Sequence, residues 1–380
     1  MTPGAFQFER ASLVEELLRR CQRPEPVVLG GPPGAGKTTL LARVAEALAA
    51  RGARPVYLDL FGAASTPERF AGAVLQALPA EGAGPRLADA LAIRRLADGG
   101  RLKGAEAVRA LCDLLSAADR AGDRPLVLLL DEATEIRSLA YFPGLRHADQ
   151  LLAEALRARR GGTLLATSFP TLARKLWHFA EVEVAPLTDA DVADACARLS
   201  PQIDPAALVA LSWGFPRYAR LLLEAAAEGQ DLADAWCAGL TPGERLERAC
   251  RATYEALLLR SRGYGACKAA LHAVALEPGL NLTALVQRLG RTPGATRDYL
   301  HWLVDVDALR MQRKRYHFVD GLLGLWVRLY GSGTWPSEAA LREACAARLA
   351  ARPAAMPATA PAPEPAPPPR PRRDTLMEID

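Results

Sequence analysis

The stretch Gly30–Thr39, GGPPGAGKTT, interrupts an apolar segment and determines how the rest of the sequence is interpreted. From Gly31 to Thr38 it fits the pattern G-x-x-x-x-G-K-[ST], which is typical of a phosphate-binding loop. Glycines let such a loop turn its backbone N–H groups onto a phosphate, and the following helix adds its positive N-terminal end. The pattern predicts a nucleotide site made of Gly31, Pro32, Pro33, Gly34, Ala35, Gly36, Lys37, Thr38 and Thr39.

Two side chains of this loop have separate expected roles. Lys37 is expected to reach the β- and γ-phosphates and so to take part in catalysis, and the Thr38 hydroxyl is expected to bind Mg²⁺. The alternative is a Gly/Pro-rich surface turn that contains GKT by chance. A strand before the loop and a helix after it argue against that alternative, because the motif works only in this context.

Strand-like and helix-like segments alternate along the first half of the chain. The helix-like segments include TTLLARVAEALAARG, which Gly52 ends, residues 148–159 and most of 64–120. This alternation predicts an α/β fold with a parallel sheet and helices on both faces. The predicted strands are PEPVVLGG, RPVYLDL, RPLVLLLDE, TLLATS and EVEVAPL.

Two carboxylates follow the third predicted strand, LVLLLDE. Asp131 ends that strand, where ligands bind in open parallel sheets, and is expected to hold the Mg²⁺ shell. Glu132 is expected to act as general base on the attacking water. Alternatively, both residues only cap the next helix. Because a kinase would not need this glutamate, its presence favours hydrolysis over transfer to an acceptor, which is a third interpretation.

Hydroxyl side chains end the fourth predicted strand, TLLATS. A hydroxyl at this place can hydrogen-bond the water or the γ-phosphate, and Thr167 is preferred slightly over Ser168 for this role. The alternative is that either residue caps a helix before Pro170.

Composition and length suit a protein of two or three domains, with 380 residues of which 50% are hydrophobic. The sequence contains no apolar stretch near the length of a membrane span, and MTPGAFQFERAS lacks the features of a secretion signal. Its seven cysteines form no C-x-x-C pair and are expected to be small buried residues in a reducing compartment. We therefore expect a cytoplasmic protein with no membrane partner.

Charge changes sign along the second half. Residues 181–250 hold twelve Asp and Glu against five Arg, a net charge of −7, whereas residues 263–330 hold nine Arg and Lys against five acids, a net of +4. The segment 352–373 has nine prolines and six alanines and is expected to be disordered or extended. These changes predict an ATP-site core at 1–187, a helical lid at 188–260, a further module at 261–330, a helix at 331–351 and a Pro/Ala-rich tail at 352–380.

The module at 261–330 has the pattern of a winged helix-turn-helix. Its segments are YGACKAALHAVALE, NLTALVQRLG, the turn RTPG, ATRDYLHWLVDVDAL and a basic hairpin, RMQRKRYHFVD. If it binds DNA, the major groove is expected to meet Thr292, Thr296 and Arg297, and the phosphates Arg310, Arg313, Lys314 and Arg315. The alternative is that the module serves protein docking or oligomerisation.

Taken together, residues 6–330 resemble the AAA+ ATPases, in the branch of the archaeal-type ATPases, the STAND signalling ATPases and the origin-recognition initiators. GGPPGAGKTT and LVLLLDE resemble the Walker A and B motifs, TLLATS resembles sensor 1, and FQFERASLVEELLRR resembles the segment that precedes the first strand. The resemblance implies a three-layer α/β/α P-loop fold with strand order 5-1-4-3-2.

The resemblance also assigns residues of the lid. WGFPRYARLLLEAA is similar to the G-x-P segment joined to a sensor 2 arginine, so Pro216 is expected against the base and Arg217 against the γ-phosphate. An arginine in an acidic lid over a phosphate gains a bidentate partner, although Arg217 could instead form a salt bridge within the lid.

The activity implied by this resemblance is Mg²⁺-dependent ATP hydrolysis that couples core–lid motion to the winged helix. Double-stranded DNA, a protein partner and an ATP-dependent homo-oligomer are the expected associations. The alternative is a slow-hydrolysing switch of the STAND kind that recruits proteins. An arginine finger is expected from a neighbouring subunit, and its candidates are Arg137, Arg146, Arg159, Arg160 and Arg174.

Overall fold

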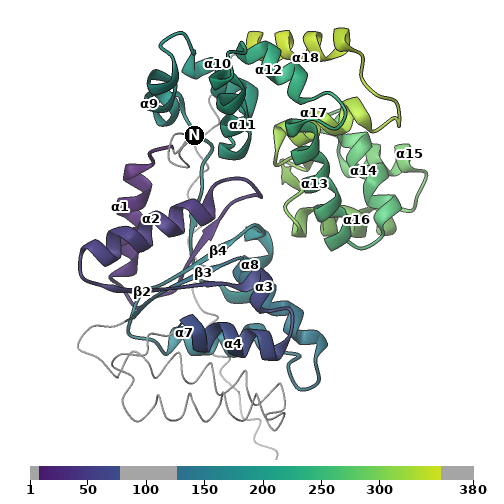
Figure 1. Ribbon diagram of the computed structural model, residues 1–380. Helices are drawn as coiled ribbons and strands as arrows, with labels where there is room; N and C mark the ends of the chain where they lie inside the picture. The colour runs from purple at the N-terminus through teal and green to yellow at the C-terminus, as the bar shows by residue number, and fades with distance from the viewer. Residues whose placement is uncertain (1–7, 78–125, 352–380) are drawn as a thin grey trace, which may run out of the picture.

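The computed structural model of the chain describes residues 8–77 and 126–351 (Figure 1). The helices expected between residues 78 and 120 and the Pro/Ala-rich tail lie outside the described residues. Within these ranges, no helix combines the length and the apolar character that a membrane span requires.

A five-stranded, all-parallel sheet forms the centre of the N-terminal half. The strand order β2-β3-β4-β1-β5 is the predicted order 5-1-4-3-2. In register, Gly30 lies beside both Thr167 and Glu183, and Asp59 beside Asp131. The carboxyl ends of the strands therefore share one edge of the sheet. The strands are β1 (Val27–Gly30), β2 (Arg54–Asp59), β3 (Leu126–Asp131), β4 (Thr163–Thr167) and β5 (Ala180–Glu183).

Helices cover both faces of this sheet, as the α/β prediction requires (Figure 1). Successive strand residues point to opposite faces, so Leu129 packs with α1 and α2 while Leu128 packs with the helices of the other face. The first face carries α1 (Ala11–Cys21) and α2 (Lys37–Ala50). The second carries α3 (Leu60–Ala63), α4 (Pro67–Ala77), η1 (Ala133–Tyr141), α7 (Ala148–Arg157) and α8 (Pro170–Trp177).

Five helices follow the sheet and form the lid. Thr188 and Asp191 start the first of them with a capping box, in which each side chain bonds the backbone N–H of the other residue. The lid helices are α9 (Asp189–Leu199), α10 (Pro205–Ser212), α11 (Pro216–Ala227), α12 (Leu232–Gly239) and α13 (Arg245–Arg260).

The C-terminal module consists of three helices, a two-stranded antiparallel hairpin and two further helices. Gly290 ends α15 in the left-handed conformation, and Thr292 caps α16, whose first residue is Pro293. The elements are α14 (Tyr264–Leu276), α15 (Leu282–Leu289), α16 (Pro293–Asp305), β6 (Leu309–Gln312), β7 (Arg315–Phe318), α17 (Gly321–Tyr330) and α18 (Glu338–Ala350).

One cluster of buried side chains runs through both the lid and the C-terminal module as far as Cys345, and it also includes Phe169 of the core. Helix α18 returns to the lid, where it packs on α10 and α12. The change of charge near residue 260 therefore does not coincide with a break in the hydrophobic core. Lid and module are packed as one unit, so a displacement of the lid also displaces the module.

Candidate active site

The loop between β1 and α2 is folded around its own lysine. Lys37 is 4% exposed, and its Nζ donates to the carbonyl oxygens of Gly31 at 2.8 Å and Pro32 at 3.1 Å. Burial lowers the pKa of Lys37, against the opposing charges of Glu132 and Asp131. The lysine thus sits at the start of α2 with its charge directed into the loop, where phosphates would bind.

A hydroxyl and a carboxylate meet next to this loop. Thr38 Oγ1 donates to Asp131 Oδ2 at 2.6 Å, and Asp131, at the end of β3, is only 3% exposed. Hydroxyl and carboxylate oxygens are donors that suit Mg²⁺, which keeps several waters and takes few protein ligands. The two side chains therefore fit the metal role predicted for them.

Tyr57, on β2, is a third member of this group that the sequence did not reveal. Its hydroxyl donates to the same Oδ2 of Asp131 at 3.0 Å. Burial and the charge of Asp131 raise the pKa of Tyr57, so the hydroxyl stays a donor. The only sign of it in the sequence was the alternation in RPVYLD. That pattern indicates that Tyr57 lies on one face of the sheet, but not that its hydroxyl contacts Asp131.

Glu132 follows Asp131 in a left-handed backbone conformation, with φ of 45°. Few residues other than glycine adopt this conformation, and it is often found where function requires it. The carboxylate of Glu132 accepts bonds from the Ser168 hydroxyl at 2.6 Å and from the Ser168 backbone N–H at 3.1 Å. Ser168 thus fixes the predicted general base from the end of β4.

Thr167 does not have the predicted position. It is fully buried, its Oγ1 lies 2.9 Å from Thr134 Oγ1, and it accepts a bond from the backbone N–H of Phe169. Thr167 ends β4 and Ser168 follows it, and only one of the two hydroxyls lies against Glu132. The structure places Ser168 there, which corrects the preference for Thr167.

The start of α11 lies directly on the phosphate-binding loop. The Arg217 backbone N–H donates to Gly34 O at 3.3 Å. A Cβ on Gly34 would be 3.1 Å from Arg217 Cβ, and one on Gly36 would be 3.4 Å from Pro216 Cγ. Both glycines also have φ of 88°, so they allow the loop's turn and the close approach of the lid.

The guanidinium of Arg217 is held within the lid, although not by an acid. Its Nη1 donates to Thr253 Oγ1 of α13 at 2.9 Å. Pro216 and Arg217 are therefore beside the loop, as their predicted roles require, and Thr253 is a lid partner that sequence reasoning missed. A hydroxyl is a weaker partner than a phosphate for a guanidinium, so this bond can be exchanged.

The C-terminal module contacts the core close to Glu132. Asp307 accepts bonds from the Thr171 backbone N–H at 3.1 Å and the Thr171 hydroxyl at 2.6 Å, at the first turn of α8. Burial raises the pKa of Asp307 to about 6, against the lowering effect of the Thr171 bonds. Since Thr171 is three residues after Ser168, this contact links the module to the segment that holds Glu132.

Two ion pairs also join the core to the unit formed by lid and module. Lys175 Nζ is 2.5 Å from Asp305 Oδ1, and Arg260 Nη1 is 2.5 Å from Glu135 Oε1. The Arg260 guanidinium also lies 4.8 Å from the centre of the Phe169 ring. The contacts therefore reach η1, which follows Glu132, as well as α8, which follows Ser168.

The residues predicted to contact DNA differ in how exposed their side chains are and in whether these are already hydrogen-bonded. Thr292, Arg297, Arg313 and Lys314 are exposed, and the last two form the hairpin turn with φ of 48° and 63°. Thr296 is 0% exposed, so its predicted groove contact is corrected: its side chain points into the module. The exposed Arg315 donates from Nη1 to Gly279 O at 2.9 Å, which occupies part of its guanidinium.

The arginine-finger candidates also differ in their exposure and in their bonding partners. Arg159 is 3% exposed and donates to Leu126 O at 2.6 Å, so it supports the sheet and cannot reach a neighbouring subunit. Arg174 pairs with Glu181 at 2.7 Å. Arg137, Arg146 and Arg160 are exposed.

Residues 8–165 match the family model described as "AAA ATPase domain". Among solved structures, the Walker-type ATPase of Pyrococcus abyssi superposes with a TM-score of 0.61 at 16% identity, over 85% of this chain and 96% of that one. A mutant RuvB of Thermotoga maritima (TM-score 0.37, 18% identity, 81% and 89% covered) and the AMPPCP-bound DnaA of Aquifex aeolicus (0.35, 12%, 76% and 85%) are more distant. No curated protein matches the chain significantly in sequence.

Proposed function

We propose that this chain, whose residues 8–165 match the AAA ATPase domain, binds Mg²⁺-ATP between sheet and lid and hydrolyses it. One observation carries the proposal: Lys37, the Thr38–Asp131 pair and Glu132 converge at one edge of the sheet. A phosphate loop, metal donors and a base are the parts that phosphoryl transfer to water requires.

The residues of the loop would act first. The triphosphate would settle on the loop N–H groups, and Lys37 Nζ would exchange the Gly31 and Pro32 carbonyls for β- and γ-phosphate oxygens. Thr38 and Asp131 would hold Mg²⁺, which neutralises phosphate charge when bound. Tyr57 would keep Asp131 in place through its hydroxyl.

Glu132 would take the proton of the attacking water at its carboxylate. Ser168 acts as a positioning residue, since its hydroxyl and N–H both hold that carboxylate. Catalysis would come mainly from this positioning and from charge neutralisation by Lys37 and Arg217. Arg217 would leave Thr253 for the γ-phosphate, and Pro216 would lie against the base.

Hydrolysis would change the angle between the core and the lid. Lid and module share one hydrophobic cluster, so such a change would act on the contact between Asp307 and Thr171. We propose that the module then binds double-stranded DNA through Arg297, Arg313 and Lys314, which are exposed. An ATP-dependent homo-oligomer and a protein partner belong to the same proposal. The six cysteines among the described residues are buried and free, which agrees with the reducing conditions of the cytoplasm.

A second candidate is a slow-hydrolysing regulatory switch. The observation that favours it is the contact of the module with the core beside the Ser168–Glu132 bond. The module thus contacts the segment that holds Glu132, and a movement of the module would act on this segment. Turnover with and without duplex DNA separates the two: stimulation indicates a DNA-dependent motor or loader, and indifference indicates the switch.

The ATPase proposal is tested with two variants. Lys37→Ala should abolish ATP binding in calorimetry, because the phosphates lose their charged partner, whereas Glu132→Gln should bind ATP and lose turnover by about 10²- to 10⁴-fold. Lys268→Ala, at an exposed lysine of α14, is the matched control and should change neither. Unchanged turnover of Glu132→Gln would show that the base has been misassigned.

The DNA proposal requires a salt titration. Changing Arg313 and Lys314 to Ala should weaken duplex binding, and the slope of log K against log salt should fall by about 0.9 per lost phosphate contact. The control changes Arg19 and Arg23, which are exposed on and after α1. An unchanged affinity and slope would remove the hairpin from the proposed interface.

A further inference from the structure

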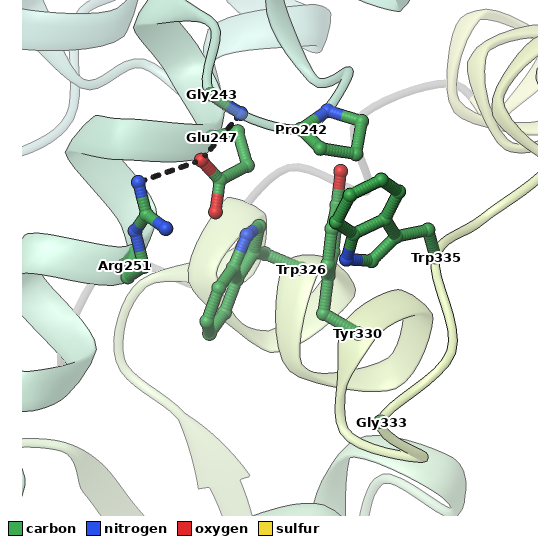
Figure 2. A pocket seen from close by; sticks show the side chains of 8 residues that line it. All are labelled: Pro242, Gly243, Glu247, Arg251, Trp326, Tyr330, Gly333 and Trp335. Atoms are coloured by element: carbon green, nitrogen blue, oxygen red, sulfur yellow. Dashed lines mark hydrogen bonds and ion pairs between the residues drawn. The ribbon is translucent and has the colours of Figure 1, made fainter.

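A cavity of about 430 Å³ opens between the start of α13 and the C-terminal end of α17 (Figure 2). None of the residues assigned to the nucleotide site lines it. Its walls are aromatic on one side, with Trp326, Tyr330 and Trp335, and carry a carboxylate, Glu247, on the other.

The aromatic wall is a rigid surface with one unused donor. Trp326 and Tyr330 are stacked, with ring centres 5.4 Å apart and an angle of 18° between the planes. The Tyr330 hydroxyl donates to Leu240 O at 2.5 Å, which fixes this ring. Trp326 is 7% exposed, and its Nε1 has no hydrogen-bond partner among the described residues. Trp335, by contrast, is 77% exposed beside the cavity.

Glu247 brings a negative charge into this cavity. It is 3% exposed, and its Oε2 accepts a bond from the Gly243 N–H at 3.1 Å and lies 3.4 Å from Arg251 Nη2. No described residue bonds its other oxygen, Oε1, and Figure 2 shows this oxygen on the side of Trp326. A buried carboxylate with a free oxygen favours a ligand that carries a guanidinium.

These features match the chemistry of a proline-rich peptide that contains arginine. Proline rings pack on flat aromatic side chains, and polyproline II leaves its carbonyl groups free to accept bonds, as the Trp326 N–H requires. An arginine next to the prolines would pair with Glu247 and lie over an aromatic face.

The chain itself contains such a segment. Residues 367–373 read PPPRPRR, in a tail that follows α18. Helix α18 has 13 residues and is thus ~20 Å long, and Trp335 lies three residues before it. The twenty residues from Ala350 to Arg370 span ~60 Å as polyproline II, so the segment can return along α18 to the cavity.

We propose that this cavity binds the segment 367–373 of the same chain, with an arginine paired to Glu247. The inference is independent of ATP hydrolysis and gives the tail a binding site on the lid–module unit. Any partner that captures the tail would then have to compete with this cavity.

Fluorine NMR of the full chain, labelled with 5-fluorotryptophan, tests the proposal. Trp335→Phe assigns one of the six tryptophan signals. Changing Arg370, Arg372 and Arg373 to Ala should shift the Trp335 signal, and a synthetic peptide of residues 361–373 added to that variant should shift it back. The matched control changes Asp374, Glu378 and Asp380 of the same tail to Ala and should leave the signal in place.

Affinity for the peptide, measured in the tail variant, tests the carboxylate. Glu247→Gln keeps an acceptor for the Gly243 N–H, so the turn remains intact while the dissociation constant should rise at least tenfold. Glu244→Gln, an exposed residue before the same helix, should not change it. An unmoved Trp335 signal together with no peptide binding would overturn the proposal. A shift that depends on protein concentration would overturn its intramolecular form.

Discussion

Replacing Asp307 by Ala should detach the C-terminal module from the first turn of α8. The carboxylate accepts two bonds from Thr171, each worth ~1.5–3 kcal/mol for a charged acceptor. Against this stands burial, which raises the pKa from 3.8 to about 6. This raised pKa already includes the two Thr171 bonds, so desolvation offsets much of what they contribute to the charged form. We therefore take about 1 kcal/mol for each bond, which gives about 2 kcal/mol in favour of the contact. This free energy is a factor of ~30 in the ratio of attached to detached module.

The backbone amide of Thr171 reports this ratio directly. It lies in the first turn of α8, where N–H groups have no partner within the helix, so Asp307 is what protects it from exchange. Hydrogen exchange at Thr171, measured by NMR, should therefore become ~30-fold faster in Asp307→Ala. Amides of the central strand β3 should keep their protection, because the sheet is not altered.

The control for this experiment is Asp298→Ala, which removes an exposed aspartate from α16. It changes the charge of the module by the same amount and should leave the Thr171 exchange rate unchanged. If Asp307→Ala gives the same rate as the native protein, the contact does not hold the module, and the link proposed between module and core is refuted.

Three further perturbations follow from the site. Ser168→Ala should lower kcat about tenfold with little change in KM, because Glu132 loses its hydroxyl donor. Ser168→Thr should restore much of the rate. A normal kcat in Ser168→Ala would contradict the positioning role. Tyr57→Phe should weaken Mg²⁺-ATP binding several-fold in calorimetry, since Asp131 loses one of its two hydroxyl donors, and unchanged affinity would show that this bond is dispensable. The raised pKa of Asp307 means that its ionised form is disfavoured in the contact, so the contribution is full below about pH 4 and declines as pH rises through about 6. Thermal unfolding at pH 5 and 7 should show this extra stability at pH 5 in the native chain and not in Asp307→Asn.

Much of the N-terminal half could be predicted from local sequence alone. The conformation of GGPPGAGKTT follows from its residues, because Gly34 and Gly36 adopt positive φ angles that other residues avoid. LVLLLDE is apolar enough to require burial on both faces of a sheet. The position of Asp131 at the carboxyl end of its strand follows from the same pattern. These features depend on neighbouring residues in the chain, so the sequence determined them.

The choice between Thr167 and Ser168 was decided only by tertiary structure. Thr167 is the last residue of β4 and Ser168 follows it, and the packing of η1 on one face of the sheet buries Thr167 against Thr134. Burial of Thr296 in its module has the same origin. The sequence shows that side chains alternate, but which face meets the site depends on segments distant in the chain.

The contacts of Tyr57 with Asp131 and of Asp307 with Thr171 join residues 74 and 136 positions apart. No local pattern specifies them, since the first joins two neighbouring strands of the sheet and the second joins the C-terminal module to the core. The sequence by itself determined the phosphate loop and the place of Asp131 at the end of its strand, and the order of the strands followed from the resemblance to the AAA+ ATPases. Tertiary packing decided which hydroxyl faces Glu132 and which surface of the C-terminal module touches the core, because those depend on how the units fit together.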